Sequence, residues 1–160
     1  MNRKLVVYFS AGGVTKKTAE NLSKAIGADL FEIKPEVPYT PKDLNWRDKT
    51  ARSTIEMHDL NFRPAITGEC EKIAEFDVIF VGFPIWWYIA PTIINTFLEK
   101  YDLSGKTIVP FATSGGSGMG ETNKKLQPSC PNSKLLEGKI LNRASEAELI
   151  IWVENLKLGC

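Results

Sequence analysis

Cysteine and histidine, which supply many metal and nucleophilic sites, are scarce in this sequence. Its 160 residues include three cysteines, Cys70, Cys130 and Cys160, and a single histidine, His58. The cysteines are widely spaced and lack a C-x-x-C pair or a neighbouring histidine, which disfavours a metal centre or a redox pair and favours a reducing compartment. His58 lies in the polar stretch EMHDLN, and this setting favours a surface residue over a Ser-His or Cys-His catalytic arrangement.

Long apolar runs and an excess of charge of one sign are also lacking. The formal net charge is +1, which gives no bulk attraction to nucleic acid or to an acidic membrane surface. No stretch approaches the roughly 18 uncharged residues of a spanning helix. The run LVVYF near the amino terminus is too brief for the core of a signal peptide. We therefore expect a cytoplasmic protein without a nucleic-acid or membrane partner, and the length fits one domain over residues 1–160.

Short β-rich runs alternate with helical patterns along the chain. Runs of β-branched and aromatic residues predict strands at 4–9, 29–34, 77–83 and 107–113, and less strongly at 134–141. Apolar residues at helical spacing, with proline or glycine at the ends, predict helices at 15–27, 91–101, 119–127 and 145–158. In the last helix, Ser145 followed by Glu148 is typical of a capping box.

Strands separated by helices imply right-handed crossovers and a parallel sheet that is covered on both faces. The predicted fold is a three-layer α/β/α sandwich around five parallel strands. Residues 35–68 are irregular and rich in proline and charge, with a short helix expected near 48–57. A connection this long either has a function or covers part of the domain, and the sequence leaves both readings open.

The loop after the first strand reads SAGGVT, residues 10–15, and leads directly into a helix. Gly12 and Gly13 allow a sharp turn, the free N–H groups at a helix start attract an anion, and Ser10 and Thr15 add hydroxyl donors. The loop matches neither G-x-x-x-x-G-K-[ST] nor G-x-G-x-x-G, which disfavours nucleoside triphosphates and dinucleotides. A phosphate site is favoured, and a plain strand-to-helix turn is the alternative.

Two further loops follow predicted strands. FPIWWYIAP, residues 83–91, carries three consecutive aromatic residues, and ATSGGSGMG, residues 112–120, is crowded with glycine and hydroxyl groups. Open parallel sheets bind ligands at the carboxyl ends of their strands, where these loops lie. A phosphate in the first loop, a planar ring on Trp86 or Trp87 and a polar ring edge at the amides of 113–118 would together accommodate flavin mononucleotide (FMN).

With these three motifs in order, the chain resembles the flavodoxin family over nearly its whole length. The matching segments are YFSAGGVTKKTA for the phosphate loop, GFPIWWYIAP for the first ring-binding loop and ATSGGSGMG for the second. The resemblance implies cofactor-binding residues in each loop: Ser10, Gly12, Gly13, Val14 and Thr15; Pro84, Ile85, Trp86, Trp87 and Tyr88; Thr113, Ser114, Gly115, Gly116, Ser117 and Gly118.

The resemblance also implies noncovalently held FMN, strand order 2-1-3-4-5 and a redox function. The flavin then supplies the chemistry while the protein sets its potential and access, so no catalytic side chain and no metal ligand is expected. The partners would be redox proteins or a small planar electron acceptor.

The sequence departs from the usual pattern of this family at three points. Gly12 stands where a threonine is usual, which removes a hydroxyl contact to phosphate. The near-neutral charge differs from the acidic charge that steers electron carriers to basic partners. PIWWYIA has no glycine, whereas many members flip a glycine peptide there to stabilise the one-electron semiquinone. We hypothesise that semiquinone stabilisation is weak, and a large stable semiquinone fraction on anaerobic reduction would contradict this.

Three function classes follow. The first is an electron carrier between a reductase and acceptor proteins. The second is a small FMN-dependent NAD(P)H oxidoreductase acting on quinones or nitro compounds, favoured by a ring face that stays open unless Tyr39 or Trp46 covers it. The third is a binding module without flavin, since a fold does not fix a function.

Overall fold

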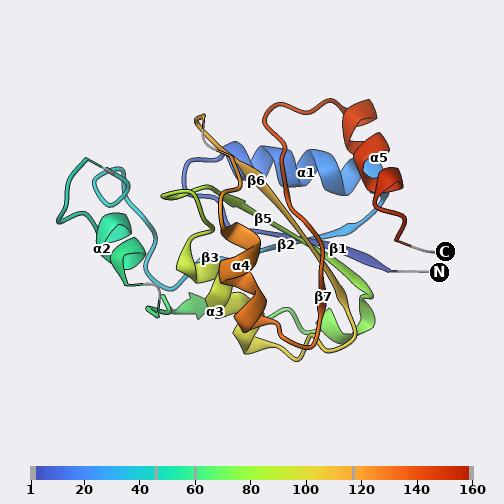
Figure 1. Ribbon diagram of the computed structural model, residues 1–160, viewed down its shortest axis with the longest axis horizontal. Coiled ribbons are helices and arrows are strands. Elements are labelled where there is room, and N and C mark those ends of the chain that lie inside the picture. The colour runs from blue at the N-terminus through green and yellow to red at the C-terminus, as the bar shows by residue number, and fades with distance from the viewer. Residues whose placement is uncertain (1–2, 46, 60, 117, 159–160) are drawn as a thin grey trace.

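A six-stranded parallel sheet forms the centre of the protein, as the computed structural model shows for residues 3–45, 47–59, 61–116 and 118–158 (Figure 1). The strands run in the order β2-β1-β5-β6-β7, and β8 also pairs with β6, farther along that strand than β7 does. Their bounds are β1 Lys4–Tyr8, β2 Asp29–Glu32, β5 Val78–Pro84, β6 Thr107–Thr113, β7 Lys134–Leu135 and β8 Lys139–Ile140. Since β7 and β8 together occupy the place of one strand, the predicted order 2-1-3-4-5 is confirmed.

Helices cover both faces of this sheet. Figure 1 shows α1 (Val14–Ile26) with α5 (Glu146–Asn155) on one face, and α3 (Thr92–Lys100) with α4 (Thr122–Leu126) on the other. The predicted capping box of α5 is present, because the Ser145 hydroxyl accepts from the N–H of Glu148 and the Glu148 carboxylate accepts from the N–H of Ser145. None of the helices among the described residues is long and apolar enough to cross a membrane.

Alternate residues of each strand supply two separate cores. Val6 of β1 and Phe80 of β5 are fully buried with α1 and α5, while Val7 and Val81 are fully buried with α3. This period of two is what a pleated strand imposes when both faces of the sheet are covered. The buried runs in the sequence therefore correspond to the three central strands, which carry the candidate loops.

The last predicted strand, 134–141, is divided into β7 and β8, and the prediction of one continuous strand was wrong. The two pieces pair with residues 107–108 and 111–112 of β6, on either side of Pro110. Proline has no N–H to donate to a neighbouring strand. Gly138 lies between the two pieces and close to this proline. A Cβ added to Gly138 would lie 3.0 Å from the Cβ of Pro110, so a glycine suits this position.

The helix predicted at 119–127 is shorter than expected. Gly120 has φ +54°, which a right-handed helix does not allow, so α4 begins only at Thr122. After Leu126 the chain tightens into the 3₁₀ helix η2 (Gln127–Ser129), which includes Pro128. Residues 119–121 thus belong to the loop and not to the helix.

The connection 35–68 forms a lobe at one end of the protein (Figure 1, cyan to green). It contains α2 (Arg52–His58), close to the short helix predicted near 48–57, and the strand β4 (Ile66–Thr67). β4 pairs in antiparallel fashion with β3 (Lys34–Pro35), and the two form a small separate sheet that the sequence did not predict. The short 3₁₀ helix η1 (Ile73–Glu75) then leads into β5.

Candidate functional site

The three predicted loops lie at the same edge of the sheet. β1, β5 and β6 are adjacent and parallel, so the segments that follow Tyr8, Pro84 and Thr113 all leave from their carboxyl ends. The Ile85 N–H donates to the Thr113 carbonyl at 2.9 Å, which fixes the second loop beside the third. This edge is therefore the candidate functional site.

The first loop presents exposed backbone at the start of α1. Gly13 has φ +94° and precedes the first helical residue, Val14, whose side chain is exposed. The Gly13 N–H donates to the Ser10 hydroxyl at 3.0 Å, which folds the loop back on itself. Nothing lies within 4 Å of the positions that a Cβ on Gly12 or Gly13 would take. The first turn of α1 holds no acidic residue, so the loop suits an anion.

A buried hydrogen bond joins the first and third loops. The Thr15 and Thr113 hydroxyl oxygens are 2.7 Å apart, and both residues are almost completely buried. The two residues are 98 positions apart in the sequence, and the parallel pairing of β1, β5 and β6 brings them together. One hydroxyl donates to the other, and this bond links the two backbone-lined loops.

The second loop is a tight aromatic turn. The N–H of Trp86 donates to the Ile89 carbonyl at 2.9 Å, and the reverse bond measures 3.2 Å. The two residues between them, Trp87 and Tyr88, have φ values of +51° and +66°. This is the backbone of a two-residue hairpin turn that glycine or asparagine usually occupies.

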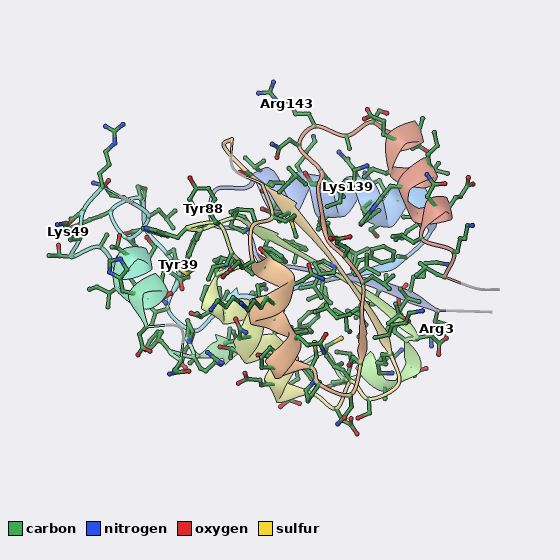
Figure 2. All side chains as sticks on the ribbon, viewed as in Figure 1. Arg3, Tyr39, Lys49, Tyr88, Lys139 and Arg143 are labelled. Atoms are coloured by element: carbon green, nitrogen blue, oxygen red, sulfur yellow. The ribbon has the colours of Figure 1, made fainter. Side chains whose placement is uncertain are left out.

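The three aromatic residues of this turn point in different directions. The Trp86 ring is half-buried and meets Phe9 and Tyr39 edge to face, with ring centroids 5.8 Å and 5.4 Å away. Trp87 is 37% exposed and Tyr88 is 66% exposed, and Tyr88 is labelled at this edge in Figure 2. Trp87 and Tyr88 are therefore the rings most open to a ligand, while Trp86 anchors the turn.

The third loop is held by a residue that the sequence analysis missed. Asn142, just beyond β8, accepts from the Ser114 N–H at 2.9 Å and donates to the Ser114 carbonyl at 2.7 Å. The Gly116 N–H donates to the Ser114 hydroxyl at 3.2 Å. Gly115, Gly116 and Gly118 have open space where a Cβ would be, and Ser117 lies outside the described residues. An asparagine next to a strand end was the only available signal in the sequence.

The lobe contributes a buried charged cluster behind Trp86. The Tyr39 hydroxyl donates to the carboxylate of Glu56, which is 4% exposed and also accepts from Arg52 Nε at 2.9 Å. The Arg52 guanidinium lies over the Tyr39 ring, 3.8 Å from its centroid. Burial and the Glu56 carboxylate raise the pKa of Tyr39 above its ordinary value. Tyr39, which is labelled in Figure 2, packs edge to face against Trp86 and so supports the turn. Trp46 lies outside the described residues.

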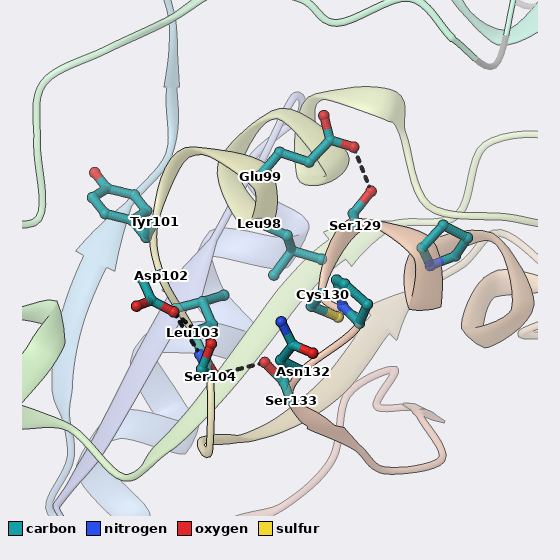
Figure 3. Close-up of a pocket in the computed structure, with 12 residues that line it drawn as sticks. Leu98, Glu99, Tyr101, Asp102, Leu103, Ser104, Ser129, Cys130, Asn132 and Ser133 are labelled. Atoms are coloured by element: carbon teal, nitrogen blue, oxygen red, sulfur yellow. Dashed lines mark hydrogen bonds between the residues drawn. The ribbon is translucent and has the colours of Figure 1, made fainter.

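A second hollow lies at the opposite edge, where β6 and β7 begin. Figure 3 shows this pocket of about 300 Å³ between residues 98–104 and 128–133. Its polar groups bond to one another: Ser129 donates to Glu99 at 2.7 Å, Ser104 to Asp102 at 2.6 Å and Ser133 to the Leu103 carbonyl at 2.6 Å. These serine and carboxylate groups already have partners within the protein.

The described residues contain no group of three or more His, Cys, Asp or Glu side chains that could hold a metal ion. Cys70 and Cys130 are buried and unpaired, and burial raises the pKa of both thiols, which keeps them protonated and unreactive. What the site offers is backbone N–H groups, hydroxyl groups and aromatic faces.

Comparisons with known proteins concern the fold as a whole. A family model described as flavodoxin matches residues 3–156. A crystal structure of a Bacteroides eggerthii DSM 20697 protein, provisionally described as a flavoprotein, is 46% identical, with a TM-score of 0.95 over 99% of this chain and 100% of that one. A Lactobacillus acidophilus NCFM flavoprotein in complex with FMN shares the fold at 21% identity, with a TM-score of 0.73 over 96% of this chain and 99% of that one.

One curated relative is more distant. The Escherichia coli (strain K12) protein described as uncharacterized NAD(P)H oxidoreductase YcaK is 23% identical over 91 residues. The match covers 56% of this chain and 42% of YcaK. The chain therefore aligns with less than half of that relative's length.

Proposed function

This chain belongs to the flavodoxin family, and on that premise we propose that it binds FMN as one domain and transfers electrons between a reductase and acceptor proteins. The observation that carries the proposal is the Thr15–Thr113 hydrogen bond, which joins the phosphate-type loop to the third loop. In the second loop, the Ile85 N–H donates to the backbone carbonyl of the same Thr113. One ligand with a phosphate and a planar ring could thus contact all three loops.

The first loop fits the phosphate of FMN. The exposed backbone of Gly12 and Gly13 lies at the positive end of the α1 dipole, and no acidic side chain in the first turn opposes a phosphate. The Ser10 hydroxyl accepts from Gly13 and keeps its own hydrogen to donate. Val14 would contribute its N–H, because it is the first residue of α1 and the first turn of a helix has no intrahelical acceptor for its N–H groups.

The other two loops fit the flavin ring. The exposed rings of Trp87 and Tyr88 could stack on it, and aromatic pairs are worth about 1 kcal/mol beyond burial. The open glycines of the third loop let backbone N–H groups approach the polar ring edge. Bound FMN supplies the redox chemistry, and these residues would orient it, limit its exposure and tune its potential. All sixteen cofactor-binding residues stay predictions.

A second candidate is a small FMN-dependent NAD(P)H oxidoreductase that reduces a quinone or nitro compound. The exposure of Tyr88, at 66%, favours it, because the turn leaves room for a small planar acceptor beside the ring site. The relative described as an NAD(P)H oxidoreductase also supports it, over 56% of this chain. The near-neutral net charge weakens electrostatic docking of a carrier to its reductase.

The first experiment is to record the visible spectrum of the purified protein with FMN added, and then to titrate it anaerobically with a reductant. Bound flavin, seen as a shifted absorption band and quenched emission, supports the proposal, and a protein that ignores FMN contradicts it. Reduction in two separate one-electron steps would favour the carrier. Reduction in a single two-electron step, with steady NAD(P)H oxidation by the protein alone when a quinone is present, would favour the enzyme.

A further inference from the structure

The aromatic turn holds an unfavourable backbone conformation. Trp87 and Tyr88 both have positive φ, a conformation that is unfavourable for a residue with a side chain. Glycine or asparagine at these two positions would remove most of that cost. A strained conformation persists only where its surroundings determine it, so something outside the turn must hold it in place.

Gly120, in the loop between β6 and α4, is in contact with this turn. A Cβ built on Gly120 would lie 2.2 Å from the Tyr88 carbonyl oxygen, 3.0 Å from its Cβ and 3.2 Å from its carbonyl carbon. Two of these three atoms belong to the Tyr88 backbone and cannot turn aside as the end of a side chain can. The bare Cα of Gly120 therefore lets the Tyr88 peptide come close to the chain before α4.

Gly120 differs in this respect from the other glycines of the third loop. Gly115, Gly116 and Gly118 have nothing within 4 Å of their missing Cβ atoms. Those three leave backbone open to a ligand, whereas Gly120 lies against protein. The third loop thus has two parts, one open and one that supports the neighbouring turn.

We propose that Gly120 is a positioning residue that fixes the Trp87–Tyr88 turn in the geometry needed to bind the flavin ring. It acts through the Tyr88 backbone and does not itself touch the cofactor. The ligand in this inference rests on the proposed function. The inference predicts that any side chain at position 120 displaces Tyr88, opens the Trp86–Ile89 hydrogen-bonded pair and weakens FMN binding.

The test compares Gly120→Ala with a matched control, Gly105→Ala. Gly105 has φ +77° and nothing within 4 Å of its missing Cβ, and it lies between α3 and β6 at the opposite edge of the sheet. Both substitutions place alanine in the left-handed region and carry that backbone cost, but only Gly120→Ala also meets Tyr88. We expect the Kd for FMN, measured by flavin fluorescence quenching, to rise about tenfold in Gly120→Ala and to stay unchanged in Gly105→Ala.

A second readout needs no flavin. Amide hydrogen exchange of the apoprotein should show lower protection of the Trp86 and Ile89 N–H groups in Gly120→Ala than in Gly105→Ala. Equal protection in the two folded variants, or FMN affinities within twofold of each other, would overturn the inference. If the wild-type protein fails to bind FMN, the proposed function fails, and the exchange data still decide the role of Gly120.

If Gly120→Ala does not fold, Gly120→Asn takes its place. Asparagine tolerates the left-handed region better than alanine and still carries the Cβ that meets Tyr88. Its control is Gly105→Asn, and the expected and contradicting results are the same.

Discussion

The two edges of the sheet are built in different ways. At the carboxyl edge the loops expose glycine backbone, two aromatic rings and a strained turn. At the amino edge the pocket between residues 98–104 and 128–133 is lined by polar side chains that already bond to one another. At the carboxyl edge the glycines leave backbone exposed, whereas at the amino edge serine and carboxylate side chains are bonded within the protein. The two edges therefore differ in what they offer a ligand: exposed glycine backbone and aromatic rings at one, and polar groups already bonded to the protein at the other.

The largest effect is expected from a substitution in β5, the strand that runs from one edge of the sheet to the other. Gly82 lies in the middle of β5, where an added Cβ would be 2.2 Å from the buried Phe111 ring. We expect Gly82→Ala to lower the free energy of unfolding by about 3 kcal/mol, since a packed core resists overpacking. Chemical denaturation measures this, and amide exchange should rise at both edges. A loss below about 1 kcal/mol would mean that the Phe111 ring moves aside.

Removing one buried hydroxyl at each edge tests whether the two edges differ in their effect on FMN binding. Thr113→Val leaves Thr15 without its partner, and Ser129→Ala removes bonds to Asn95 and Glu99. Each substitution should cost about 1–3 kcal/mol in the free energy of unfolding. Only Thr113→Val should also raise the Kd for FMN, about tenfold, because it releases the first loop from the third. Weaker FMN binding in Ser129→Ala would remove the distinction between the edges.

A pair of tyrosines tests the same distinction with a smaller effect. Tyr88 is exposed at the carboxyl edge, whereas the Tyr101 hydroxyl accepts from the Cys70 N–H at 2.9 Å near the amino edge. Tyr88→Leu should change the free energy of unfolding by less than about 0.5 kcal/mol and raise the Kd for FMN roughly fivefold, the equivalent of about 1 kcal/mol of stacking. Tyr101→Leu should do the reverse, with lower stability and unchanged FMN affinity. Fluorescence titration and thermal melts on both variants decide the matter.

The smallest expected effect is the pH dependence of the amino edge. Hydrogen bonds from Arg63, assisted by Ser129, hold the pKa of Glu99 below its ordinary value. A carboxyl group with a lowered folded-state pKa stabilises the protein above its unfolded pKa, near 4.3, and loses that contribution as pH falls through the folded-state pKa. Because the Glu99 side chain is 41% exposed, the contribution should stay below about 1 kcal/mol.

Denaturation of wild type and Glu99→Gln between pH 3 and pH 7 measures this contribution. The stability difference between them should be largest at neutral pH and shrink toward pH 3, with FMN affinity at neutral pH unaffected by the substitution. A difference that grows on acidification would contradict the assigned pKa direction.

Much of this architecture could be predicted from local patterns in the sequence. Alternating apolar residues indicated the strands and covering helices, and the glycine and aromatic loops indicated which edge to examine. The split of the last strand could not be found locally, because its cause, Pro110, lies on the neighbouring strand. The sequence also could not show which of Trp86, Trp87 and Tyr88 is packed against the protein. Only the contacts of Phe9 and Tyr39 show that it is Trp86.

The contacts that position the site join residues far apart in the sequence. Thr15 bonds Thr113 across 98 positions, and Asn142 bonds Ser114 across 28. Single-sequence patterns report residue type and spacing, so they name candidate loops without showing what holds those loops together. The Tyr39–Glu56 bond likewise gives residues 35–68 a supporting role that composition alone left open.

Pro110 also affects how readily the sheet edge next to β6 could pair with a strand of another molecule. An outer strand with a continuous row of unpaired backbone groups invites another chain to add itself to the sheet. Here the outer position beyond β6 is filled by two separate pieces of two residues each, β7 and β8. The missing proline N–H that divides them therefore also denies a second molecule a long, regular edge on this side of the sheet, which disfavours edge-to-edge pairing there.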